Sequence, residues 1–95
     1  MAERTVISAE SVPRLPRGVR LTFDKARDRW TVLAPERLFV PDEIALEIIR
    51  RCDGEATVAA IVDELAAKFS APRDVIDRDV RTLLQDLADK GVMAA

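Results

Sequence analysis

Between Trp30 and Gly54 the sequence changes its hydrophobic period, and this change constrains the fold more than any other feature. Upstream, apolar and polar side chains alternate, as they do in a half-buried strand: Val19, Leu21 and Phe23. Downstream, apolar side chains fall at offsets of zero, four, five and eight residues, as on one stripe of a helix: Ile44, Ile48, Ile49 and Cys52. The chain is therefore expected to begin with a small sheet and to end with helices.

The strand-like part predicts a hairpin followed by one short extra strand. Residues 19–23 and 30–32 form the hairpin around the polar loop 24–29, with Trp30 and Val32 on one face and Thr31 on the other. Pro35 suits the second position of a four-residue turn over residues 34–37. Residues 37–40 then make a third strand that ends at Pro41.

The helix-like part predicts three helices. The first begins at or near Pro41 and ends at Gly54, where glycine takes the left-handed conformation. The second begins after Thr57, and its expected inward residues are Val58, Ile61, Val62, Leu65 and Phe69. The third spans about residues 72–90 and stops at Gly91, with these inward residues: Ile76, Val80, Leu83, Leu84 and Leu87. Val92 and Met93 then either pack back or begin a short terminal strand.

This order of elements predicts an α+β fold like a winged helix-turn-helix: three short antiparallel strands followed by a three-helix bundle. Ninety-five residues suffice for one domain with one small core. We assign that domain to residues 12–95. Residues 1–11 have only scattered apolar positions and are expected to be a flexible lead-in.

The composition removes most of the chemistry that small domains perform. The chain has no histidine and one cysteine, so an internal disulfide, a structural zinc site and a histidine-dependent nucleophile are excluded. Cys52 is interpreted as a small buried hydrophobe and Trp30 as mostly core. We expect no catalytic residue, no metal and no cofactor. No apolar run reaches about 18 residues and no secretion leader is apparent, so a cytoplasmic protein without membrane contact is expected.

Charge is divided unevenly along the chain. Residues 1–40 carry eight Lys or Arg against five Asp or Glu, and residues 41–95 carry seven against twelve, which gives the net charge of −2. In the third helix Arg73, Arg78, Arg81 and Lys90 are outnumbered by aspartates, which disfavours contact with phosphates. A winged-helix DNA-binding regulator is thus the alternative, and no nucleic acid partner is expected. A catalytic pair among the aspartates is a third reading, but a solvated helix face explains their spacing.

The strongest candidate for a working surface is the edge of the third strand. Unpaired backbone groups at a sheet edge accept another extended chain, and Pro35 and Pro41 limit uncontrolled pairing here. The strand would contribute Arg37, Leu38, Phe39 and Val40. The third helix would form the far wall of a groove with Val75, Asp79, Thr82, Leu83 and Asp86. In the alternative reading, these strand residues are only core and the N-terminal segment covers the edge. An open edge also makes either a monomer or a weak dimer plausible.

Several short motifs together resemble one known family over about residues 12–93. They are Pro13-x-Leu15, Gly18-Val19-Arg20-Leu21, Leu33-Ala34-Pro35-Glu36, Cys52-Asp53-Gly54, Thr57-Val58 with Ile61, and Asp79-Val80 with Leu83, Leu87 and Gly91. In this order and spacing they resemble the PqqD family of pyrroloquinoline quinone (PQQ) biosynthesis.

The resemblance implies a non-enzymatic peptide chaperone with a small winged-helix-like fold. Such proteins bind the leader of the precursor peptide PqqA and deliver it to the radical S-adenosylmethionine (SAM) enzyme PqqE, which cross-links a Glu and a Tyr of PqqA. Related recognition elements bind leaders as an added strand against the third strand, beside the third helix. The resemblance therefore implies the same edge that the residues themselves indicate. It carries over no role for residues 1–11.

Overall fold

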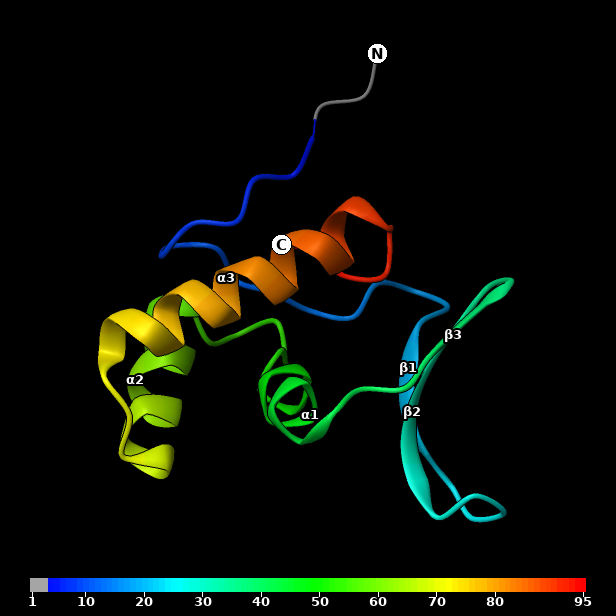
Figure 1. Ribbon diagram of the computed structural model, residues 1–95. Helices are drawn as coiled ribbons and strands as arrows, with labels where there is room; N and C mark the ends of the chain where they lie inside the picture. Colours follow the sequence, from blue (N-terminus) through cyan, green and yellow to red (C-terminus); the bar gives the residue numbers. More distant parts are fainter. Residues whose placement is uncertain (1–3) are drawn as a thin grey trace.

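The computed structural model describes residues 4–95 and contains three strands followed by three helices. The strands are β1 (Arg20–Asp24), β2 (Arg29–Ala34) and β3 (Arg37–Phe39), and they form one antiparallel sheet in the order β1-β2-β3. The helices are α1 (Glu43–Arg50), α2 (Val58–Phe69) and α3 (Arg73–Asp89). In Figure 1 the sheet stands at one side, and α1 lies between it and α2. The predicted order of elements is confirmed.

The register of the sheet divides its side chains between two faces. Leu21 lies opposite Val32, and Val32 lies opposite Phe39, so these three side chains share the face that packs on the core. Trp30 shares this face with Val32, as predicted, and Thr31 lies on the other face. Thr31 is nevertheless buried, and its hydroxyl has no hydrogen-bond partner among residues 4–95.

The third strand ends at Phe39, one residue before the predicted end at Val40. Asp42 caps α1 by accepting a hydrogen bond from the Ala45 amide at 2.8 Å. The chain must therefore leave the sheet directly after Phe39 to reach the cap. At the other end of β3 a two-residue loop closes the hairpin, with Glu36 at φ 58°, the positive value that a type II turn requires at its third position.

The helix ends follow local signals that the sequence carries. Thr57 caps α2 by accepting from the Ala60 amide at 3.1 Å, which confirms the predicted cap. Gly54 and Gly91 take φ values of 79° and 76°, so both are glycines at left-handed positions, and Gly91 follows the end of α3 as predicted. The predicted end of the first helix at Gly54 is wrong, because α1 ends at Arg50 and Arg51 is its C-cap. The four helix boundaries of α2 and α3 lie within a residue of those expected.

The core forms where the three helices meet the inner face of the sheet, and its fully buried side chains include Ile48, Ile61, Leu65 and Leu84. Two residues expected in it are instead exposed, Ile44 (51%) and Phe69 (37%). In α1 the buried stripe is Ala45, Ile48 and Ile49, whose helical spacing is as good as the predicted one. The small Ala45 faces inward, and Ile44 is turned toward solvent.

The C-terminal residues return to the core and tie the two ends of the chain together. Val92 and Met93 are each 4% exposed and pack against the core, which confirms the first of the two expectations for these residues. Arg14 and Ala94 then exchange backbone hydrogen bonds of 2.8 Å in both directions as an isolated antiparallel bridge.

The prediction of a flexible lead-in is wrong for residues 4–11, and residues 1–3 lie outside the described part. Ile7 is only 6% exposed and belongs to the core. The Gln85 side chain on α3 accepts from the Ile7 amide at 2.9 Å and donates to the Thr5 carbonyl at 2.7 Å. Figure 1 shows the segment running above α3. The pattern missed this because one buried isoleucine has no periodic partner.

The same segment also stabilises the start of α2. The first amides of a helix have no partner within the helix. Here Val58 donates to the Ser11 carbonyl at 2.8 Å, and Ala59 donates to the Ala9 carbonyl at 3.0 Å. The segment therefore does not cover the edge of β3, which was the alternative reading of that strand.

Candidate peptide-binding groove

The edge of β3 that faces away from β2 has no strand beside it within residues 4–95. Arg37 and Leu38 are exposed, the latter at 58%, and Phe39 is half-buried against the core. The expectation that Leu38 is only core is therefore wrong. A row of backbone groups beside an exposed apolar side chain is the arrangement that accepts an added strand.

Two hollows lie near this edge, one beside β3 and one between α1 and α3. The first, of about 290 Å³, is lined by Arg37, Leu38, Phe39, Leu87, Lys90 and Val92. The second, of about 250 Å³, is lined by Asp42, Ile44, Ala45, Ile48, Asp79 and Leu83. The first hollow includes all of β3, and the second includes Asp42, three residues after the end of β3. An extended peptide beside β3 would contact the first hollow, and a continuation of it toward α1 would reach the second.

One stripe of α3 forms the helical side of both hollows. Asp79, Leu83, Leu87 and Lys90 are spaced by four, four and three residues, so they lie on one side of the helix. Leu83 is half-buried and packs against the core, instead of lying fully inside it as predicted. The helix therefore offers two leucines toward the groove, with a carboxylate at one end and an ammonium at the other.

The predicted helix wall is only partly brought together. Asp79 and Leu83 line the second hollow, as expected for the groove. Thr82 and Asp86 instead line a hollow of about 450 Å³ on the neighbouring side of α3, next to Ile7. Val75 lies one turn before Asp79 and lines neither groove hollow. Val40 is 40% exposed but lies outside both hollows and outside the strand.

Sequence reasoning missed the residues that come from α1 and from the end of α3. Ile44 was assigned to the core, although the Ala45 stripe fits the helical period equally well and would have turned Ile44 outward. Leu87 and Val92 were treated only as core, yet they also line the first hollow. Lys90 also lines the first hollow, although the predicted helical wall ends at Asp86.

Charges on α3 oppose the DNA-binding alternative. The three cations of α3 and its C-cap Lys90 each face a carboxylate: Arg73 pairs with Asp63, Arg78 with Asp79 at 3.9 Å, Arg81 with Asp77 at 3.0 Å, and Lys90 with Asp86 at 2.9 Å. Cations that are already neutralised within the molecule gain less from binding phosphates. The helix that a winged-helix protein inserts into DNA is therefore poorly suited to that role here.

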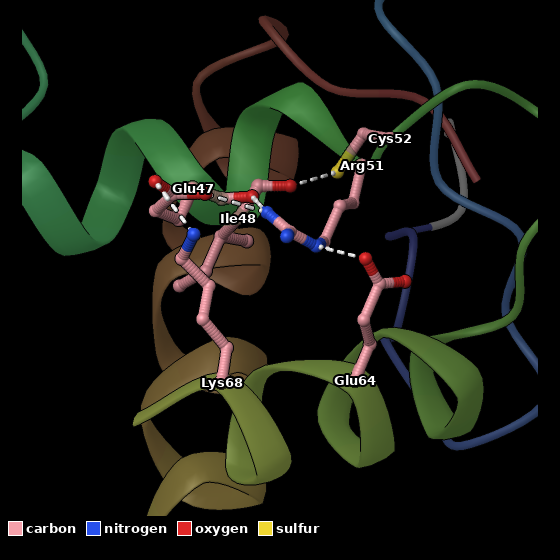
Figure 2. A network of polar contacts seen from close by, with 6 residues as sticks. All are labelled: Glu47, Ile48, Arg51, Cys52, Glu64 and Lys68. Carbon is pink, nitrogen blue, oxygen red and sulfur yellow. Dashed lines mark hydrogen bonds and ion pairs between the residues drawn. The ribbon is translucent and has the colours of Figure 1, made fainter. Parts of the chain in front are cut away.

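A polar network fixes α1 relative to α2, and α1 supplies one wall of the second hollow (Figure 2). Arg51 donates to the Glu47 carboxylate at 2.7 Å and to the Glu64 carboxylate of α2 at 2.9 Å. Lys68 of α2 approaches Glu47 at 3.8 Å. The hydrogen bond from Arg51 holds the pKa of Glu47 below its ordinary value, and both side chains are only 19% exposed.

Cys52 follows Arg51 directly and is buried, which agrees with its interpretation as a hydrophobe. Its thiol donates to the Ile48 carbonyl at 3.2 Å (Figure 2), and burial raises its pKa to about 12. A thiol with this pKa is not a nucleophile near neutral pH.

Trp30 is half-buried, not wholly core. Its ring meets Phe23 edge to face with centroids 5.4 Å apart, and the Arg50 guanidinium lies 4.7 Å from the ring centroid. Arg50 belongs to α1, so this contact joins α1 to the sheet.

Within residues 4–95 no group of three or more His, Cys, Asp or Glu side chains is placed to hold a metal ion. In the same part of the chain, no helix combines the length and the apolar character needed to cross a bilayer.

The family model of coenzyme PQQ synthesis protein D (PqqD) matches residues 29–93, from the start of β2 to the end of the core. The chain belongs to the PqqD family. A "PqqA binding protein" of Rhodopseudomonas palustris is 56% identical over 94 residues, which cover 98% of this chain and 92% of that protein. A "Bifunctional coenzyme PQQ synthesis protein C/D" of Methylorubrum extorquens is 42% identical over 92 residues, which cover 97% of this chain and 25% of that protein.

A solved structure agrees with the fold described above. The solution NMR structure of the PqqD truncation of Methylobacterium extorquens PqqCD has a TM-score of 0.82 and 40% identity, and the match covers 99% of this chain and all of that one. Its description calls that truncation a functional and stand-alone recognition element for ribosomally synthesized and post-translationally modified peptides. The α+β fold and the family resemblance seen in the sequence are both confirmed.

Proposed function

We propose that this chain is a non-catalytic peptide chaperone of the cytoplasm that binds the leader of PqqA by adding it to the edge of β3, and that presents the bound peptide to PqqE. Relatives named "PqqA binding protein" support the choice of peptide. The observation that carries the proposal is the open edge of β3 facing the apolar stripe of α3.

The geometry explains how such a site accepts peptides of different sequence and still selects among their side chains. Backbone hydrogen bonds to the edge of β3 depend little on the sequence of the peptide. Alternate side chains of an added strand point to one face, so every second residue would enter the groove. Leu83 and Leu87 supply apolar contact there, and Ile44 closes the end next to α1.

Charge at the two ends of the groove supports one direction of the bound peptide over the other. Lys90 lies at the Arg37 end, whereas Asp79 and Asp42 lie at the α1 end. A peptide with an acidic side chain toward Lys90 and a basic one toward Asp79 is therefore favoured over the reversed peptide, but only weakly, because Lys90 is paired with Asp86 and Asp79 with Arg78. The disordered peptide loses entropy when it is ordered, so moderate affinity suffices for delivery.

A substitution in the groove and a matched one outside it test the proposal. Ile44→Asp places a carboxylate in the second hollow. The control, Phe69→Asp, places one at the end of α2, outside the groove, and both native side chains are exposed and apolar. We expect Ile44→Asp to weaken binding of the PqqA leader by about tenfold, because burial of such a side chain contributes roughly 1.5–3 kcal/mol. Phe69→Asp should leave the affinity unchanged.

Binding is measured by isothermal titration calorimetry, and circular dichroism confirms that both variants are folded. Equal affinities of the two variants, or a loss caused only by Phe69→Asp, would exclude the groove as the peptide site.

A further inference from the structure

The sheet has an outer face that the groove does not use. Arg20 lies opposite Leu33, and Leu33 lies opposite Leu38, so these side chains share one face. Val32 and Phe39 point to the other face and pack on the core. The first set therefore points away from the helices, which lie on one side of the sheet in Figure 1.

An apolar hollow with a cation at its rim lies at one end of the sheet, and Arg20 and Leu33 of the outer face belong to its lining. Gly18, Val19, Arg20, Leu33, Ala34 and Pro35 line a hollow of about 410 Å³ where β1 begins and β2 ends. Leu38 is 58% exposed on the same face. An apolar centre with a charged rim is the composition typical of protein interfaces.

The cations of the three strands, Arg20, Arg29 and Arg37, have no ion-pair partner within residues 4–95, whereas those of α2 and α3 are all paired. Of the 15 Lys and Arg, eight form ion pairs within residues 4–95, including every one that belongs to α2 and α3. The seven without a carboxylate within 4.0 Å in that part of the chain are Arg14, Arg17, Arg20, Lys25, Arg29, Arg37 and Arg50. Six of them fall within residues 14–37, which include only three carboxylates.

We propose that this outer face docks an acidic, partly apolar surface of the enzyme that receives the peptide. Uncompensated cations add little to the stability of the fold, but they accelerate and select the approach of an acidic protein. The proposal rests on the function proposed above, and it adds the surface by which delivery takes place.

The two surfaces adjoin but do not overlap. A peptide added to β3 extends the sheet sideways, so the outer face with Arg20, Arg29 and Leu33 stays open. Leu38 borders both surfaces, since it lines the first groove hollow and is opposite Leu33. An enzyme docked on the outer face would therefore lie next to the bound peptide, and both can be held at the same time.

The test compares two double charge reversals of equal net charge. Arg20→Glu with Arg29→Glu changes two unpaired cations of the outer face, and Arg73→Glu with Arg78→Glu changes two exposed cations of α3. Binding to purified PqqE is measured at low salt without PqqA, and binding to the PqqA leader is measured separately.

The outer-face variant should bind PqqE about tenfold more weakly, with a smaller salt dependence, and should keep its affinity for the leader. The α3 variant should keep its affinity for PqqE. Unchanged binding of PqqE by the outer-face variant, or equal losses in both variants, would overturn the proposal.

If the outer face binds nucleic acid or a second copy of the chain in place of the enzyme, the same variant gives a different result, which also overturns the proposal. Loss of binding to a short DNA duplex, with binding of PqqE unchanged, would assign the face to nucleic acid. Loss of self-association in sedimentation, again with PqqE unaffected, would assign it to a second copy of the chain. Failure of the native chain to bind the leader would count against the proposed function alone, because the PqqE measurement contains no leader.

Discussion

Replacing Ile7 by alanine tests whether the N-terminal segment is part of the fold. The substitution removes the side chain beyond Cβ from a site that is 6% exposed. Loss of that apolar burial corresponds to about 2 kcal/mol, and the residual cavity adds to it within the range of roughly 2–5 kcal/mol known for such changes. A surface segment can partly collapse onto α3, so we expect a loss of about 2–3 kcal/mol.

For a domain of this size the loss lowers the melting temperature by roughly 10–20 °C, measured by circular dichroism. The matched control is Val6→Ala, because Val6 is the neighbouring residue and is 69% exposed. It should change the stability by less than about 0.5 kcal/mol. If both variants melt together with the native chain, the segment is the flexible lead-in that its sequence pattern predicts, and the contacts of Gln85 do not persist.

Three further predictions concern caps, pH and thiol chemistry. Thr57→Ala should cost about 1 kcal/mol in urea unfolding, because the Ala60 amide loses its acceptor, and Thr57→Ser should restore most of it. The pKa of Glu47 is lowered in the folded state, so its contribution to stability is complete above its unfolded pKa and is lost as the pH falls below about 4.5. Glu47→Gln should therefore reduce the loss of unfolding free energy with acid. If the loss is unchanged, the ion pair of Glu47 with Arg51 does not contribute to acid stability. Cys52 should resist alkylation at pH 8 and react at once in denaturant, whereas rapid labelling of the folded chain would contradict its burial.

The fold could be predicted from the sequence because local signals and hydrophobic periods agree with each other. The alternation around Leu21, the Thr57 cap and Gly91 each specify an element or its end without reference to the rest of the chain. The position of Ile7 could not be predicted, since a single apolar residue in an extended segment has no period. It packs in the core, and its backbone amide donates to Gln85, 78 residues away, so the contacts that place it are not local in sequence.

The candidate groove was predictable at its strand and less so at its helix. β3 is an edge strand because the sheet has the order β1-β2-β3, and consecutive short strands joined by tight loops indicate this order in the sequence. Which side of α3 faces the strand depends on the rotation of the helix, and a rotation error of one position exchanges Asp86 for Leu87. The orientation of Ile44 was missed for the same reason.

The most direct test of the account is amide hydrogen exchange in β3 with and without the PqqA leader. The account predicts that amides of Arg37–Phe39 that point away from β2 exchange fast in the free protein and slowly in the complex, because the added strand accepts their hydrogen bonds. Protection that appears only in α2, with exchange in β3 unchanged, would contradict it.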